Sequence, residues 1–221
     1  TLHTEHATAA PVNTKRLIDF AWSPANPTKG GLIFANAGND TTLTLKIWTA
    51  DGAGGGSWSG LVNSAASGRL GAMAIDGRKG AEEFLACEKD ANNDIFCFRG
   101  DTAPGWTTPA NNVLTTNSQA GIERSFDLAY EATSGALGLA VYSDNTVTPK
   151  YRKYDPTTNA FDGAASSITV SGGGVLTTVR LIPDSSGDDI MILMGDAAND
   201  LRSIVWDGLS DALYSSPAGK A

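Results

Sequence analysis

The sequence predicts an all-β protein made of four similar units. Its 221 residues include 25 glycines, and only 18% are charged, a composition that suits short strands and tight turns better than long amphipathic helices. The segment Asp90–Trp106 contains a turn, a strand, a second turn that begins at Asp101, and an aromatic residue. Variants of this segment begin at Asn36, Asp144 and Asp196. One unit therefore occurs four times along the chain.

We expect four short strands in each unit, in the order of an antiparallel meander. In the first unit, 16–68, they are 16–22, 31–35, 43–48 and 58–62; in the second, 69–123, they are 69–75, 83–87, 95–98 and a strand from residue 106. In the third unit, 124–176, they are 124–130, 137–142, 149–154 and a strand at residue 161; in the fourth, 177–221, they are 177–182, 190–194, 201–206 and a strand at residue 214. Residues 1–15 are a polar leader outside the units, where a strand over 7–12 would serve as a closing or exchanged strand.

Two sets of landmarks share one spacing. The turns before the third strands and the aspartates after them both recur about every 50–55 residues. A period of this size built from four strands is typical of a β-propeller blade, which cannot bury its faces alone and stacks on its neighbours. We therefore expect four propeller-type blades, which fit either a small closed ring or part of a larger ring or assembly.

An aspartate closes the third strand of each unit and is flanked by aromatic residues. The aspartates are Asp51, Asp101, Asp155 and Asp207, and the tryptophans beside them are Trp48, Trp58, Trp106 and Trp206. A carboxylate at such a turn can accept backbone N–H bonds, and the rings can pack between sheets. The segment Thr49–Trp58 resembles the Asp-box, S/T-x-D-x-G-x-x-W, of sialidase-like propellers, with extra residues before the tryptophan. The other three turns depart further from this pattern. The resemblance implies a folding role for these blade turns and no catalysis.

The two cysteines predict a disulfide. Cys87 and Cys97 are equally far from a hairpin turn centred near Asn92, so they should face one another on adjacent strands. Their spacing fits neither a redox pair nor a zinc site. The alternative is a pair of reduced core cysteines. A disulfide favours an extracellular or cell-surface location.

Two surface sites are candidates for modification or metal binding. Asp90, Asn92 and Asp94 have the spacing of three oxygen ligands for calcium. The same residue types favour a hairpin turn without metal, and the later ligands of a helix–loop–helix calcium site are missing. Asn39 begins an N-x-T sequon on an expected turn, where it could be glycosylated.

Charge and histidine content argue against several function classes. The 16 basic and 24 acidic residues give a net charge of −8, which disfavours nucleic acid and anionic membranes as partners. No apolar run reaches the roughly 18 residues that span a bilayer. The two histidines, His3 and His6, lie in the leader, so a catalytic triad lacks a rigidly held imidazole. We expect no enzyme, and no cofactor other than a calcium ion.

The sequence favours a non-catalytic repeat protein at the cell surface or outside the cell. It would act in structural assembly, as in a filament, a pilus-like appendage or a surface layer, or it would bind a partner. The expected partners are further copies of the chain, another surface protein or a glycan. The alternative is a lectin that uses exposed Trp58, Trp106 or Trp206, or a sialidase-like or other glycosidase-like propeller.

Overall fold

The computed structural model of the protein describes residues 17–36, 40–121, 124–170 and 173–214, which form nineteen β-strands. The polar leader with its expected strand over 7–12, His3, His6 and the sequon residue Asn39 lie outside the described residues. In the described segments, no helix is long and apolar enough to cross a membrane. The expected all-β architecture is confirmed, because the strands form four separate antiparallel sheets in sequence order.

Each sheet begins with a meander of four strands. The first contains β1 (Ile18–Ser23), β2 (Asn26–Phe34), β3 (Thr44–Ala50), β4 (Gly56–Trp58) and β5 (Val62–Asn63); the second contains β6 (Leu70–Gly77), β7 (Glu83–Asp90), β8 (Ile95–Asp101), β9 (Gly105–Thr107) and β10 (Val113–Thr115). The third contains β11 (Phe126–Tyr130), β12 (Gly138–Tyr142), β13 (Lys150–Asp155), β14 (Ala160–Phe161) and β15 (Ser166–Ser167); the fourth contains β16 (Leu176–Pro183), β17 (Ile190–Asp196), β18 (Leu201–Asp207) and β19 (Ala212–Leu213).

The fourth strand of the first sheet is broken, so the prediction of one continuous strand over 58–62 was wrong. β4 and β5 both pair with β3, on either side of a gap. In the gap, the Ser59 hydroxyl accepts the N–H of Ile47 at 2.9 Å, where a backbone carbonyl would normally accept it. In the third sheet a side chain likewise takes the place of a backbone acceptor, because the Asp162 carboxylate accepts the N–H of Lys153 at 3.3 Å. A side-chain acceptor thus moves the backbone of the outer strand off the ladder.

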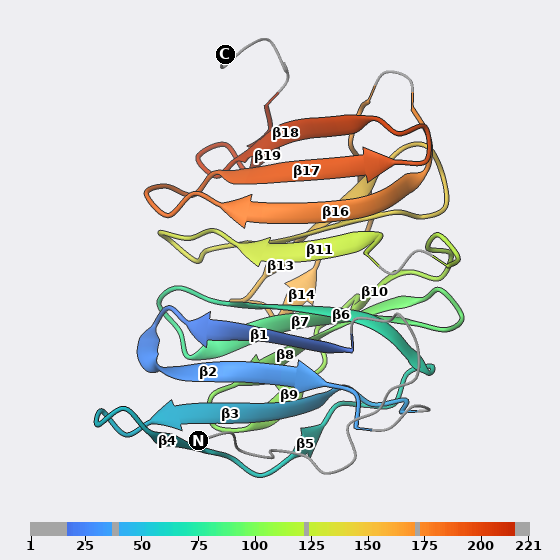
Figure 1. Ribbon diagram of the computed structural model, residues 1–221. Coiled ribbons are helices and arrows are strands. Elements are labelled where there is room, and N and C mark those ends of the chain that lie inside the picture. Colours follow the sequence, from blue (N-terminus) through green and yellow to red (C-terminus); the bar gives the residue numbers. More distant parts are fainter. Residues whose placement is uncertain (1–16, 37–39, 122–123, 171–172, 215–221) are drawn as a thin grey trace.

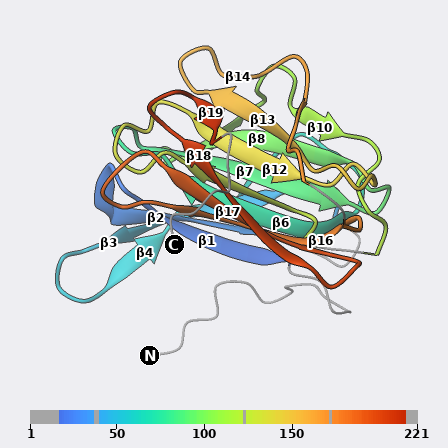
Figure 2. The same cartoon turned by 90° about the horizontal axis from the view of Figure 1, so that it is seen from above.

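The sheets stack through their first strands. β1, β6, β11 and β16 lie side by side in that order, and the first and fourth sheets extend from this row in opposite directions (Figure 1). The later strands of the second and third sheets lie behind the row, as the view from above shows (Figure 2). Buried apolar side chains form three separate cores, one between each pair of neighbouring sheets. Each sheet therefore depends on its neighbours for burial, as expected of a repeat architecture.

A row of four paired residues crosses every sheet at the same register. The rows are Trp22–Gly30–Trp48–Trp58, Gly77–Phe84–Gly100–Trp106, Tyr130–Gly138–Tyr154–Phe161 and Pro183–Ile190–Trp206–Leu213. We call each of these a cross-sheet row. Glycine leaves room for the neighbouring rings, since a Cβ atom on Gly30 would lie 2.3 Å from the ring of Phe20. The rows explain why aromatic residues repeat with the period of the sequence.

The predicted disulfide is present. Cys87 on β7 and Cys97 on β8 are directly paired across the ladder, fully buried, and joined by an S–S bond. The hairpin turn centred near Asn92 places them opposite one another, as the sequence indicated.

Candidate functional site

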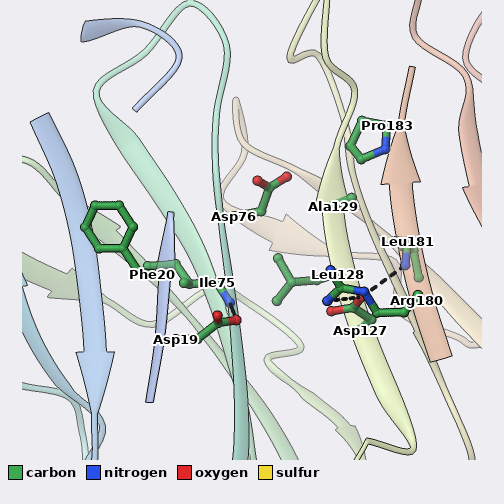
Figure 3. A pocket seen from close by; sticks show the side chains of 10 residues that line it. All are labelled: Asp19, Phe20, Ile75, Asp76, Asp127, Leu128, Ala129, Arg180, Leu181 and Pro183. Atoms are coloured by element: carbon green, nitrogen blue, oxygen red, sulfur yellow. Dashed lines mark hydrogen bonds and ion pairs between the residues drawn. The ribbon is translucent and has the colours of Figure 1, made fainter. Parts of the chain in front are cut away.

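A pocket lies where the first strands of all four sheets meet. It has a volume of about 300 Å³ and is lined by side chains of β1, β6, β11 and β16 (Figure 3). Its polar lining comes from Asp19, Asp76, Asp127 and Arg180. Phe20 borders the pocket, but its ring lies on the other side of β1 from the Asp19 carboxylate, against Trp22 (Figure 3). We call this the inner-strand pocket. Each sheet contributes to it, so the pocket exists only when the four sheets are stacked.

The three aspartates of the pocket also link neighbouring sheets. Asp19 accepts the N–H of Ile75 at 3.3 Å, Asp76 accepts that of Tyr130 at 2.7 Å, and Asp127 accepts that of Leu181 at 3.0 Å. First strands are sheet edges, and their inward N–H groups would otherwise be buried without acceptors. A carboxylate of one sheet thus satisfies the edge of the next.

Burial and mutual repulsion perturb these carboxylates. Burial raises the pKa of Asp76 to about 6, with repulsion from Asp127 and Asp19 adding to the rise and hydrogen bonds from Tyr130 and Gly77 opposing it. Burial also raises the pKa of Asp127, against the opposing effects of the Leu181 N–H and the nearby arginines. The guanidinium of Arg180 lies 3.5 Å from Asp127, and its side chain is 52% exposed at the pocket. The pocket therefore presents both acceptors and donors to a ligand.

No protein-family model matches the chain, and neither does any curated protein. Solved structures do resemble it. One is the Aleuria aurantia lectin in complex with Fucα1-6GlcNAc, with a TM-score of 0.61 and 12% identity over 95% of this chain and 66% of that one. The same lectin is described as a six-bladed β-propeller. The four sheets are built like propeller blades.

Two further structures show the same likeness. The BP39L lectin from Burkholderia pseudomallei has a TM-score of 0.60 and 13% identity over 84% of this chain and 51% of that one. TolB from Acinetobacter baumannii has a TM-score of 0.51 and 13% identity over 90% of this chain and 43% of that one. The chain thus spans between 43% and 66% of the length of these three structures. At such identities the likeness concerns the fold alone.

The aspartates after the third strands of the blades lie in turns. Asp51 accepts the N–H groups of Ala53 and Gly55, both at 2.9 Å. In the equivalent turns, Asp155 accepts from Thr157 and Asp207 accepts from Leu209. Asp101 differs, since its carboxylate lies 3.4 Å from the guanidinium of Arg99.

The tryptophans named from the sequence pack within and between blades. Trp48 and Trp58 form an edge-to-face pair with ring centres 5.3 Å apart, and the Trp106 indole donates to the carbonyl of Val62 at 3.1 Å. Trp206 is 1% exposed and donates to Glu131 at 3.3 Å. The expectation that Trp206 could be an exposed platform for a sugar was therefore wrong. Trp22, which the sequence did not single out, is 54% exposed.

The proposed calcium ligands lie in a hydrogen-bonded hairpin turn. Asp90 accepts the N–H groups of Asn92 and Asp94 at 2.9 and 2.8 Å, and the Asn92 amide donates to its other oxygen. Among the described residues, no group of three His, Cys, Asp or Glu side chains could hold a metal ion. The turn has a sister in the fourth blade, where Asp196 accepts the N–H groups of Ala198 and Asp200. Calcium binding at Asp90, Asn92 and Asp94 stays a prediction.

Sequence reasoning missed the residues of the inner-strand pocket. A signal was present, because Asp19 and Asp127 each lie three residues after an arginine that opens a unit. The second unit departs from this pattern. Its carboxylate, Asp76, lies one residue before the cross-sheet row, whereas Asp19 and Asp127 lie three residues before theirs. Only the stacking of the blades shows that each of the three aspartates accepts an N–H from the first strand of the next sheet.

Proposed function

We propose that the protein is an extracellular, non-catalytic carbohydrate-binding module whose inner-strand pocket holds a sugar. The observation that carries the proposal is one pocket of about 300 Å³ that combines three carboxylates with the half-exposed Arg180. Sugar hydroxyls donate to carboxylates and accept from guanidinium groups. The volume lies at the lower end of the range for small-molecule sites.

The pocket carboxylates keep capacity for a ligand although they link the blades. An ionised carboxylate has about four acceptor positions. Asp127 uses one of them for the N–H of Leu181, and its oxygens lie 3.5 Å from Arg180 and 3.9 Å from Arg124. The remaining acceptors and the other guanidinium N–H groups of Arg180 suit a ligand that both donates and accepts, as a polyhydroxylated molecule does.

Two further observations support a carbohydrate ligand outside the cell. Structures with the same fold include the Aleuria aurantia lectin in complexes with Fucα1-6GlcNAc and with α-methyl-L-fucoside. Fucosides are therefore the first ligands to test. The buried Cys87–Cys97 disulfide suits an oxidising compartment.

The proposal is tested by titration calorimetry with a panel of monosaccharides and fucosides. Replacing Arg180 with Ala should weaken binding of the active sugar at least about tenfold, equivalent to about 1.4 kcal/mol. The Arg180 side chain is 52% exposed, so the melting temperature should change little. Lys153→Ala, on the third strand β13 of the third sheet and away from the pocket, is the matched control and should bind normally.

Two results would overturn the proposal. If the protein binds none of the sugars, carbohydrate is not its ligand. If Arg180→Ala binds the sugar as tightly as the wild-type protein, the inner-strand pocket is not the binding site. Release of the leaving group from aryl glycosides would contradict the non-catalytic part, since glycoside hydrolysis needs only a suitably spaced pair of carboxyl groups.

A further inference from the structure

The outward face of the first blade carries the residues of a blade interface. Its cross-sheet row supplies Trp22, Trp48 and Trp58, and Phe20 lies beside them with its ring 5.0 Å from that of Trp22. In the third and fourth blades, the same positions of the third strand hold Tyr154 and Trp206, which the preceding blade buries. In the first blade, Trp22 is 54% exposed and Trp48 and Trp58 are half-buried.

The opposite end of the stack carries the other half of such an interface. Directly beside the cross-sheet row of the fourth blade runs a second line of paired residues, formed by Ile182, Met191 and Val205. In the first three blades, the second-strand residues at the position of Met191 are Gly31, Leu85 and Leu139, all buried against the next blade. Ile182 is 49% exposed, and Leu201 on the same face is 80% exposed.

The two exposed faces have the chemistry of an interface inside the chain. Between the second and third blades, aliphatic side chains such as Leu85 pack against an aromatic face that includes Tyr130, Tyr154 and Phe161. The fourth blade likewise presents aliphatic residues, and the first blade presents aromatic ones. The two faces lie at opposite ends of one molecule (Figure 1), so they cannot meet within it.

We infer that copies of this chain associate head to tail, with the aliphatic face of the fourth blade of one copy packed on the aromatic face of the first blade of the next. Such a heterologous contact builds rings or open filaments, according to the rotation between copies. At the positions of Asp19 and Asp76, the fourth blade has Arg180 and Ile182, so this joint lacks the carboxylate that links blades within the chain. The joint therefore depends mainly on apolar burial. This inference does not rest on sugar binding.

A complementation experiment tests the inference by sedimentation velocity across the micromolar range. The wild-type protein should show an average mass that rises with concentration. Trp22→Asp removes the first-blade face, and Ile182→Asp removes the fourth-blade face, so each variant alone should associate roughly a hundredfold more weakly. An equimolar mixture should form a heterodimer and stop there, because each variant keeps one intact face.

The control is Leu209→Asp, which changes a fully exposed leucine in a turn and should leave association unchanged. Far-UV circular dichroism checks that each variant is folded. A wild-type protein that is monomeric at every concentration would overturn the inference. So would an Ile182→Asp variant that still associates, which would indicate a symmetric contact through the first blade, or a mixture of the two variants that stays monomeric.

Discussion

Glu88 shows how a single buried acid can set the pH dependence of the whole stack. It lies on β7 between the first two blades and is fully buried, and no hydrogen bond of normal geometry joins either carboxylate oxygen to another residue that the structure describes. Burial raises the pKa of Glu88 to about 8; the Ser67 hydroxyl opposes the rise, and repulsion from Asp90 and Asp94 adds to it. Near neutral pH the folded protein thus keeps a proton that the unfolded chain has released.

We therefore expect the free energy of unfolding to fall as pH rises from about 5 to about 8. The sign follows because the native state binds more protons than the unfolded state throughout that range. Glu88→Gln should reduce this slope and stabilise the protein at pH 8 by about 1–3 kcal/mol. Urea denaturation at several pH values measures both effects. Glu82→Gln is the control, since Glu82 is exposed and its pKa is lowered, outside this range; a Glu88→Gln variant with the wild-type slope would contradict the prediction.

The hairpin β7–β8 is held both by its hydrogen-bonded ladder and by a covalent bond. Cys87 and Cys97 are only ten residues apart, so the disulfide closes a short loop in the unfolded chain. Replacing both cysteines with Ala should lower the free energy of unfolding by about 2–3 kcal/mol from the lost loop constraint. The variant should still fold, because seven register pairs join these strands without the sulfur atoms. Urea denaturation of the variant, beside the reduced wild-type protein, is the measurement; a variant unfolded in buffer would contradict this.

The carboxylate links between first strands can be tested at Asp127, which joins the third and fourth blades. Asp127→Ala leaves the N–H of the buried Leu181 without an acceptor. We expect this to lower the free energy of unfolding by about 1–3 kcal/mol. Asp127→Asn keeps a carbonyl acceptor and should cost clearly less. Thermal and urea denaturation compare the two variants, and equal losses would indicate that the charge, and not the hydrogen bond, stabilises the joint.

The strands were predictable because their determinants are local, whereas the links between blades were not. Turn residues and repeating aromatics depend on near neighbours in sequence, which is why the meander order and the Cys87–Cys97 pairing followed from spacing alone. The break after Trp58 depends on one hydroxyl, that of Ser59, competing with a backbone carbonyl. The pocket depends on aspartates from three blades that meet only after stacking, and no local pattern reports that.

The stability of the protein is distributed along a stack of blades. Each of the three apolar cores lies between two neighbouring blades, so the second and third blades are packed on both faces and the end blades on one. In such an arrangement, stability is approximately a sum of contributions from each unit and each interface. The end blades should therefore open more readily than the middle ones.

Hydrogen exchange at the level of individual amides measures this gradient and its dependence on concentration. Amides of β7, β8 and β12 should exchange most slowly, and those of β3 and β18 faster, because opening an end blade breaks only one interface. If copies associate head to tail, protection of β3 and β18 should rise with protein concentration while that of β7 stays constant. The Trp22→Asp variant should lose this concentration dependence and keep the gradient. Uniform protection across all four blades would contradict the additive stack, since it would mean that the blades open only together.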